Sequence, residues 1–553
     1  MARLARDLDR LKPHYDVVIV GSGYGGGISA SRLARAGKSV AVLERGREWQ
    51  TGEFPSRFPE VRAQLQVTSQ RHRLGSDTAL YDVRMGEDMH VLVGCGVGGG
   101  SLVNAGVALR PDARVFADEV WPGQIRQDGL LDEGFARAAA WLAPAQDPQA
   151  QSRTKLAALT TAGRTLDKHP APTPVAVSFA ARTNAAGIEQ PACTGCGDCV
   201  GGCNVGAKNT VALTYLPDAV RHGAEIFTHA KVRAVTPGRA HRWNVHLVRS
   251  DTNGTDEIVV GADLVILSAG TLGSTEILLR SRDRGLALSD RLGQGFSANG
   301  DIIAFGYGAN IPVDAVGVGH PIKEGLSAVG ASVTGHLAFD DPAALANGLC
   351  IQEGVLPSGL APMLPALFIP NGRLLGALQS LIAGVYKGPF ARLQTFFAVS
   401  HDTASGRFAL DGDHLRLSWP GAADEPVYAR LDAMLSKLVG GVGGSYVKNP
   451  LAGTVMGHQP ATAHPLGGCG MGTERSSGMV DHKCRVFDAS PGAGATGVHA
   501  GLYVIDGAII PRSLGVNPLL TISALSERAM IHLASDHGLS FDVAPIQPRP
   551  EAL

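Results

Sequence analysis

The sequence predicts an α/β protein in which a Rossmann-like nucleotide-binding domain is joined to a discontinuous α+β domain. Two strand–glycine–helix units, one at the start of the chain and one near residue 270, predict the first domain. The length of 553 residues exceeds what one hydrophobic core usually spans, and so predicts the second. We expect residues 1–120, 205–300 and 455–553 to form the nucleotide-binding domain, and residues 121–204 and 301–454 to form the other.

The first unit begins with the β-branched stretch 15–20, which is typical of a buried parallel strand. Gly21, Gly23 and Gly26 follow it at G-x-G-x-x-G spacing. The first glycine permits a tight turn, the second lets a pyrophosphate approach the backbone, and the third lets the next helix pack on the strand. A second strand then delivers Glu44, about twenty residues on, where an acid can accept a ribose hydroxyl. The alternative is a glycine-rich turn without a ligand.

A second glycine-rich loop spans residues 94–101 and contains five glycines. Each ordered glycine costs backbone entropy, so we interpret the loop as backbone lying flat against a planar ligand, with Asn104 directed at that ligand. Residues 45–88, between the two loops, are rich in Arg, Gln and Pro, and we expect connection and surface there.

The strand signal returns at residues 263–268 and leads into a glycine-containing helix, so we expect the first sheet to resume there. A later strand, 502–505, ends in Asp506 and Gly507. The last helix is predicted to begin at Pro518, since proline suits a first helical position.

The composition of the chain argues against several classes of function. The net charge of −1 gives no bulk electrostatic footprint for nucleic acid. No apolar run reaches about 18 residues, so we expect no membrane span, and we find no secretory signal segment. Four of the eight cysteines fall within eleven residues, which suits a reducing compartment, and we expect a cytoplasmic protein. The stretch 356–390 is apolar and interrupted by prolines. We interpret it either as core and lid of the second domain or as an apolar entrance that lies on a membrane surface or over an apolar substrate.

Two residues near the C-terminus have backbone surroundings typical of a site. His464 is followed by a proline and two glycines, which predicts a fixed irregular backbone. Asn517 precedes Pro518 and could cap the last helix or face a ligand. By spacing alone, a structural role is as good an interpretation for both.

Taken in order, these motifs resemble the glucose–methanol–choline (GMC) flavoprotein oxidoreductases, and within them the cholesterol oxidase branch. The motifs that carry the resemblance are the opening fingerprint and the segments 98–104, 270–276, 464–469, 506–507 and 515–518. The segment 352–360 resembles, more weakly, the one that carries the active-site glutamate of that branch.

The resemblance implies an FAD-binding domain, a substrate-binding domain, noncovalent FAD, and oxidation of an alcohol by hydride transfer to the flavin. His464 would bond the substrate hydroxyl and help remove its proton, Asn517 would orient substrate and flavin, and Glu353 would be a buried base. The apolar stretch 356–390 suggests a bulky, sterol-like or terpenoid-like alcohol. The expected cofactor contacts are Gly21, Gly23, Gly26, Glu44, Gly99, Gly100, Ser101, Asn104, Val232, Ala269, Asp506, Gly507 and Pro518.

One insert, 193–203, departs from the branch. Cys193, Cys196, Cys199 and Cys203 have the C-x2-C-x2-C-x3-C spacing of ferredoxins, which favours an iron–sulfur cluster, although the usual following proline is absent. A zinc site and idle thiols are the alternatives. With a cluster, electrons would leave to a protein carrier or a quinone. Without one, oxygen would reoxidise the flavin, as in an oxidase. A flavin-containing lyase and an NAD-dependent dehydrogenase are further alternatives.

Overall fold

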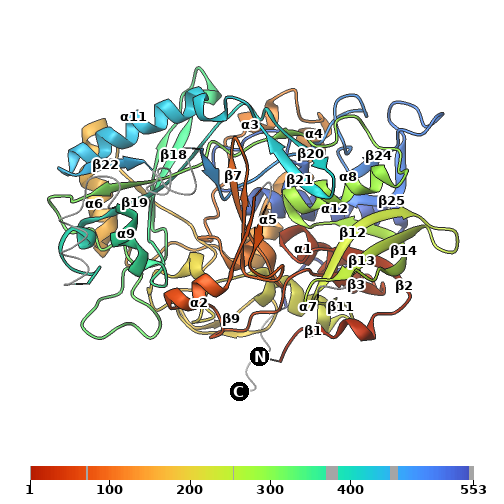
Figure 1. Cartoon of the computed structure of the whole chain (residues 1–553), viewed down its shortest axis with the longest axis horizontal. Helices are drawn as coiled ribbons and strands as arrows, with labels where there is room; N and C mark the ends of the chain where they lie inside the picture. Colours follow the sequence, from red (N-terminus) through yellow and green to blue (C-terminus); the bar gives the residue numbers. More distant parts are fainter. Residues whose placement is uncertain (1, 70–71, 253–254, 369–383, 449–458, 547–553) are drawn as a thin grey trace.

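The computed structural model describes residues 2–69, 72–252, 255–368, 384–448 and 459–546. Two large sheets organise the chain, and Figure 1 shows them toward opposite sides of the view, with β7 between them. The mixed helix–sheet architecture confirms the predicted α/β fold class. The boundaries between the two domains stay a prediction. None of the described helices is long and apolar enough to cross a membrane.

A nine-stranded sheet carries both strand–glycine–helix units. Its parallel part has the order β1 (Ala5–Arg6), β11 (Glu225–Phe227), β3 (Val40–Leu43), β2 (His14–Val20) and β14 (Ile258–Leu267). At β14 the sheet divides. Strands β25 (Val498–Val504) and β24 (Arg485–Phe487) continue from one half of β14, and β13 (Trp243–Arg249) and β12 (Ala230–Pro237) from the other. Leu264 pairs with Val17, so the second unit resumes the first sheet, as predicted.

A buried ion pair fixes the last helix relative to the first. Helix α1 (Tyr24–Arg35) packs on the parallel strands, and α7 (Tyr215–Arg221) and α12 (Leu519–His537) pack on α1. Arg32 Nε lies 3.0 Å from Glu527 Oε2, both side chains are fully buried, and the Tyr215 hydroxyl donates to Glu527 at 3.0 Å. Because a buried charge is costly without its partner, the pair holds α12 in place and so fixes where its N-terminus points.

The six-stranded sheet is antiparallel, with the order β22 (Ser445–Lys448), β16 (Ile302–Tyr307), β19 (Gln394–Ser400), β18 (Leu349–Gly354), β17 (Gly335–Phe339) and β8 (Ala171–Pro172). Helices α6 (Thr154–Gly163) and α11 (Pro426–Gly441) pack on it. Side chains alternate between the two faces of a strand, so Gln352 and Glu353 on β18 point to opposite sides of this sheet. That alternation decides which of them reaches the site.

The expectation of connection and surface over residues 45–88 is wrong. This stretch contains α2 (Phe58–Ala63) and the strands β4 (Leu65–Thr68), β5 (Arg73–Leu74) and β6 (Tyr81–Met85), which join β7 (His90–Gly94) and β23 (Ala461–Thr462) in a five-stranded sheet. The strands were missed because paired charges interrupt the apolar alternation. Asp82 binds Arg45 Nη2 at 2.8 Å and Arg84 Nε at 2.7 Å. Burial opposes ionisation of Asp82, but the two arginines outweigh it and lower its pKa to about 2.

The remaining described elements are shorter or peripheral, apart from α5 and α8. Helix α5 (Leu130–Leu142) packs on α12, and α8 (Gly270–Asp283) packs on β12. A three-stranded sheet is formed by β15 (Gln294–Phe296), β20 (Gly406–Asp411) and β21 (His414–Ser418), and a two-stranded one by β9 (Arg182–Thr183) and β10 (Glu189–Gln190). The short helices are α3 (Arg114–Ala117), α4 (Gln124–Gln127) and α9 (Leu364–Phe368).

Candidate active site

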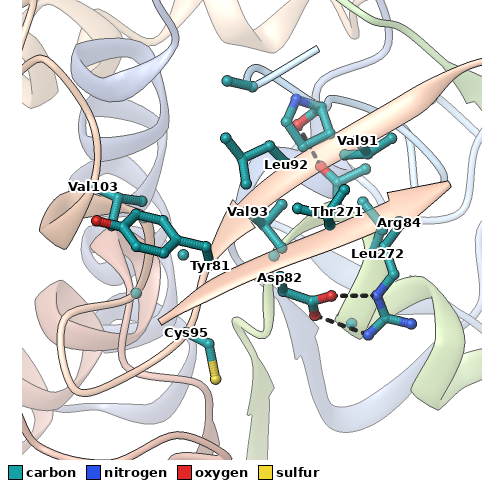
Figure 2. A pocket seen from close by; sticks show the side chains of 18 of the residues that line it. Tyr81, Asp82, Arg84, Val91, Leu92, Val93, Cys95, Val103, Thr271 and Leu272 are labelled. Atoms are coloured by element: carbon teal, nitrogen blue, oxygen red, sulfur yellow. Dashed lines mark hydrogen bonds and ion pairs between the residues drawn. The ribbon is translucent and has the colours of Figure 1, made fainter. Parts of the chain in front are cut away.

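A cavity of about 880 Å³ lies at the carboxyl ends of β2, β3 and β14 and extends to the six-stranded sheet. Its size is within the range of sites that hold small molecules and cofactors, roughly 300–1,000 Å³. Figure 2 shows part of its lining: Asp82 paired with Arg84 on β6, Val91 and Val93 on β7, and Thr271 on α8. In open α/β sheets, ligands bind outside the carboxyl ends of the parallel strands, which is where this cavity lies.

The two glycine loops meet and leave an open cradle. A Cβ added at Gly99 would lie 2.9 Å from Gly23 Cα, so the loops are in contact. A Cβ added at Gly23 or at Gly100 would have no protein atom within 4 Å, so both backbones face open space in the cavity. By contrast, a Cβ at Gly26 would lie 2.1 Å from the Gly21 carbonyl oxygen. The glycines thus divide into those that permit helix–strand packing and those that leave room for a ligand.

Eleven of the thirteen expected cofactor residues line this one cavity: Gly21, Gly23, Glu44, Gly99, Gly100, Asn104, Val232, Ala269, Asp506, Gly507 and Pro518. The other two, Gly26 and Ser101, lie behind the lining. Gly26 contacts the β2 turn, and the Ser101 hydroxyl donates to the Gly98 carbonyl at 2.6 Å and accepts from the Val211 amide at 3.1 Å. The structure therefore brings the predicted set together, with two members in supporting positions.

The acids at the strand ends are buried and hydrogen-bonded. Glu44 accepts from the Gly46 amide at 2.8 Å and from the Ser22 amide at 3.2 Å. Asp506 accepts from the Gly270 amide at 2.9 Å and from the Ala508 amide at 2.8 Å, so it joins β25 to the N-terminus of α8. Burial raises the pKa of Asp506 to about 6, although these hydrogen bonds act against the rise.

Tyr24, which was not predicted as a site residue, lines the cavity beside Asn104. Asn104 Nδ2 donates to the Tyr24 hydroxyl at 2.8 Å, and Asn104 Oδ1 accepts from the Gly106 amide at 3.1 Å. Burial raises the pKa of Tyr24, so its hydroxyl stays neutral. The position of Tyr24 directly after Gly23 was the signal that could have identified it.

His464 and Asn517, 53 residues apart in the sequence, are in contact. Asn517 Nδ2 lies 3.2 Å from His464 Nε2, and both residues line the cavity. His464 Nδ1 lies 3.1 Å from Asp301 Oδ2. Asn299 holds the loop that carries Asn517, because its Oδ1 accepts from the Leu514 amide at 2.8 Å. Helix α12 begins at Leu519, one residue later than predicted. Its N-terminus faces the same cavity, because Pro518 and Leu519 line it.

Glu353 does not join this pair. It lies on the other face of the six-stranded sheet, where its carboxylate binds Lys155 Nζ at 2.8 Å and accepts from the Gly335 amide at 2.9 Å. Both charged side chains are essentially fully buried, and burial lowers the pKa of Lys155 despite the facing carboxylate. Glu353 is absent from the cavity lining, so the geometry favours a structural ion pair over a base in contact with substrate.

Beyond His464, the cavity wall is apolar and is formed by strands β16 and β19 of the six-stranded sheet and by the segment that follows β18. Its members are Ile303, Val355, Leu356, Pro357, Leu360, Met363 and Phe397. Thr395 also lines the cavity, and its buried hydroxyl has no hydrogen-bond partner among the described residues. Of the apolar stretch 356–390, residues 369–383 lie outside the described residues.

Comparison with known proteins identifies the family to which this arrangement belongs. The N-terminal family model of the GMC oxidoreductases matches residues 24–298, and the C-terminal one matches residues 448–526. The chain is a GMC oxidoreductase. It is therefore an FAD-dependent alcohol oxidoreductase, as the resemblance implied. The open cradle at Gly23 and Gly100 and the acid at the end of β3 fit the pyrophosphate and ribose of that cofactor.

The curated relatives of this GMC oxidoreductase include two cholesterol oxidases. One, from Mycobacterium tuberculosis, is 28% identical over 94% of this chain and 91% of its own length, and one from Acinetobacter baumannii is 27% identical over 95% of both chains. A long-chain-alcohol oxidase from Arabidopsis thaliana is 26% identical over 92% of this chain and 66% of its own. Two solved structures share the fold. A fungal aryl-alcohol oxidase has a TM-score of 0.60 at 16% identity and covers 96% of this chain and 100% of its own. A pyridoxine 4-oxidase from Mesorbium loti has a TM-score of 0.58 at 18% identity, with 94% and 99% covered.

The four clustered cysteines of this GMC oxidoreductase are free thiols. Gly195, Gly197 and Gly202, which lie between them, have positive φ angles and allow the chain to turn tightly. Cys193 Sγ accepts from the Gly195 amide, and Cys199 Sγ from the Ser332 amide, each at 3.4 Å. Among the described residues, no three of these sulfur atoms lie within 4.8 Å of one another. A tetrahedral zinc would bring its sulfurs to about 3.8 Å, so the arrangement does not match a zinc site.

Lys208 connects this cysteine segment to the second glycine loop. Its buried Nζ donates to the carbonyl oxygens of Leu102 at 3.1 Å, Asn104 at 2.5 Å and Cys199 at 3.0 Å. Burial lowers the pKa of Lys208 to about 8. Because Asn104 lines the cavity, one side chain spans the distance between the cysteines and the cofactor loop.

Proposed function

We propose that this protein oxidises a bulky apolar alcohol, sterol-like or terpenoid-like, at the junction of the two sheets. One observation carries the proposal: the contact between His464 and Asn517 opens onto an apolar wall within a single cavity. A wall of aliphatic and aromatic side chains gains from burying hydrocarbon and offers little to a sugar. The names of the curated relatives, cholesterol oxidase and long-chain-alcohol oxidase, support the same substrate class.

The reacting hydroxyl would lie against His464 and Asn517. His464 Nε2 takes the hydroxyl proton, and Asn517 Nδ2 donates to the oxygen and holds it in place. Bound FAD supplies the two-electron acceptor for the hydride that leaves the carbinol carbon, and the alcohol becomes a carbonyl compound. The N-terminus of α12, which follows Asn517, contributes positive potential at the end of the cavity where negative charge develops.

Anaerobic mixing of the FAD-loaded protein with single alcohols tests this function. A sterol and a long-chain alcohol are expected to bleach the visible flavin absorbance, whereas glucose and choline are not. His464→Ala is expected to lower kcat by about 10²- to 10⁴-fold with a much smaller effect on substrate binding. Comparable bleaching by glucose would contradict the substrate class. Product formed without bleaching would instead indicate the flavin-containing lyase.

We further propose that Cys193, Cys196, Cys199 and Cys203 would hold an iron–sulfur cluster, which would supply a one-electron route to a protein carrier or a quinone. Three features support it: the ferredoxin spacing, the amide groups that donate to two of the sulfurs, and the link through Lys208 to the cofactor loop. Each cysteine of a four-iron cluster binds a different iron, so the sulfurs need not approach as closely as around zinc.

Iron and acid-labile sulfide analysis of anaerobically purified protein tests the cluster, with Cys196→Ser alongside. The proposal expects both elements in the wild type, their loss in the variant, and slow reoxidation by oxygen. Cys350→Ser is a matched control, because Cys350 is a buried free thiol outside the cysteine segment. Iron near zero, with hydrogen peroxide formed in step with substrate loss, would make the protein an oxygen-using oxidase with idle thiols.

A further inference from the structure

Two side chains that sequence reasoning did not identify contact the His464–Asn517 pair from its two ends. Asp301 directly precedes β16, and Gln352 lies on β18, so both come from the six-stranded sheet. Asp301 is 3% exposed and Gln352 is 1% exposed. Polar groups this deeply buried are costly unless their hydrogen bonds are made, so their contacts define the state of the pair.

Gln352 fixes the orientation of the Asn517 amide. Gln352 Nε2 donates to Asn517 Oδ1, so the other end of that amide, Nδ2, faces His464 Nε2 at 3.2 Å. An amide nitrogen only donates hydrogen bonds. His464 Nε2 must therefore accept, which requires that this nitrogen carries a lone pair and no proton.

Asp301 holds the other side of the imidazole. With Nε2 unprotonated, the neutral ring carries its proton on Nδ1. Nδ1 is buried and lies 3.1 Å from Asp301 Oδ2, a close ion-pair contact outside hydrogen-bond geometry, and it has no hydrogen-bond partner in the part of the chain that the structure describes. The same oxygen accepts from the Ala463 amide at 2.8 Å and the Thr462 hydroxyl at 3.1 Å, so one carboxylate fixes both the ring and the backbone that carries it.

We propose that Asp301 and Gln352 are positioning residues that lock His464 as the Nδ1–H tautomer. Nε2 then keeps a lone pair that accepts from Asn517 Nδ2 in this structure and would take the proton of a substrate hydroxyl. Gln352 acts through Asn517, and Asp301 acts on the ring directly and stabilises the imidazolium that forms when His464 takes a proton. The part played by Nε2 in catalysis rests on the proposed function, but the tautomer does not. Among the described residues, Tyr428 interacts electrostatically with Asp301 and also with Asp402 and Glu425. Asp402 is tied to the Gly300 amide and the Ser297 hydroxyl, and burial raises the pKa of Tyr428, which keeps it neutral.

Asp301→Asn tests the carboxylate. The amide keeps an acceptor oxygen but loses the charge, so the imidazolium is less stable and the ring loses its proton at lower pH. We expect the acidic limb of the pH profile of kcat/KM to move to lower pH by about one unit, with kcat lowered about tenfold or more and KM nearly unchanged. Asp402→Asn is the matched control: a half-buried carboxylate that accepts from the Gly300 amide, beside Asp301, and whose replacement should leave the limb in place. An unmoved limb in Asp301→Asn would overturn the proposal.

Gln352 is tested by a pair of variants. In Gln352→Glu the carboxylate repels Asn517 Oδ1 and turns the amide, so that its oxygen faces His464 and favours the Nε2–H tautomer. Gln352→Met only removes the hydrogen bond. We expect the glutamate variant to lose far more kcat than the methionine variant, although glutamate is closer to glutamine in shape and polarity. Equal losses, or a greater loss in the methionine variant, would contradict the role given to Gln352.

Nitrogen NMR of the folded protein labelled with ¹⁵N-histidine reads the tautomer without substrate. We assign the His464 signals by their loss in His464→Gln. The wild type should show a protonated Nδ1 and a bare Nε2, and Gln352→Glu should reverse them. A wild-type Nε2–H tautomer would overturn the proposal even if every variant is inactive. If the wild type shows the expected tautomer but oxidises no apolar alcohol, the positioning of His464 by Asp301 and Gln352 stands and the proposed function is wrong.

Discussion

Gly23→Ala is expected to abolish or greatly weaken FAD binding without destabilising the protein. A Cβ at this position would have no protein atom within 4 Å, and the φ of −69° is one that alanine adopts freely. Restricting the unfolded chain should therefore leave the apoprotein equally stable or more stable, by about 0.4–1 kcal/mol. The methyl group would occupy the space that the pyrophosphate needs. We expect the Kd for FAD to rise at least tenfold, about 1.4 kcal/mol.

Gly26→Ala is the matched control, three residues further on, in the first turn of α1. Its Cβ would lie 2.1 Å from the Gly21 carbonyl oxygen, well inside van der Waals contact, so helix α1 or the β2 turn must move. Overpacking of this kind costs about 1–3 kcal/mol. We expect Gly26→Ala to lower the Tm of the apoprotein, whereas Gly23→Ala does not.

The assay is a titration of deflavinated protein with FAD, followed by flavin fluorescence, alongside calorimetric melting of each apoprotein. The two variants should separate, with Gly23→Ala failing in binding and Gly26→Ala failing in stability. Wild-type FAD affinity in Gly23→Ala would refute the placement of the pyrophosphate. A large drop in the apoprotein Tm of Gly23→Ala would refute the claim that the cradle is open.

Three further predictions concern stability and the cofactor. Glu527→Ala should lower the free energy of unfolding by about 3–5 kcal/mol, measured by urea denaturation, because it leaves Arg32 buried without its partner; a loss under 1 kcal/mol would contradict the anchoring of α12. Burial and the nearby Arg512 lower the pKa of His401 to about 4, so between pH 6.5 and 4 the unfolded chain binds a proton that the folded one does not, and stability falls as the pH falls. The loss of folding free energy due to His401 amounts to about 2 kcal/mol at pH 5, and His401→Gln should flatten the pH dependence of stability by that amount. An unchanged pH dependence in the variant would contradict the lowered pKa of His401. Acid precipitation should leave the yellow flavin in the supernatant, and a yellow pellet would show a covalent link.

The cofactor half of the site could be predicted from the sequence because its signals are local. Gly21, Gly23 and Glu44 lie on one strand–helix–strand unit, where spacing alone dictates the geometry. The family match then confirmed the expected FAD-dependent class, and the register of β14 on β2 confirmed that the sheet resumes.

The substrate half could be predicted only in part. Glu353 and its neighbour Gln352 differ by one position, and a shift of one residue on a strand moves a side chain to the opposite face. The weak local match could not tell which of them faces the site. Asp301 and Asn299 gave no signal, because each acts on a residue more than 150 positions away, and such contacts arise only from tertiary packing. The charges of Asp82 and Arg84 concealed β6 because they interrupt the apolar alternation of the strand, and the second partner of Asp82 is Arg45, which lies 37 positions earlier in the sequence.

The most direct test of the central claim is single-turnover reduction of the FAD-loaded protein by an apolar alcohol carrying deuterium at the carbinol carbon. If the hydride leaves that carbon while His464 takes the hydroxyl proton, anaerobic bleaching should be several-fold slower than with the unlabelled alcohol, and one equivalent of carbonyl product should form per flavin. Equal bleaching rates with the two alcohols at saturating concentration, or carbonyl product with no bleaching, would contradict the account.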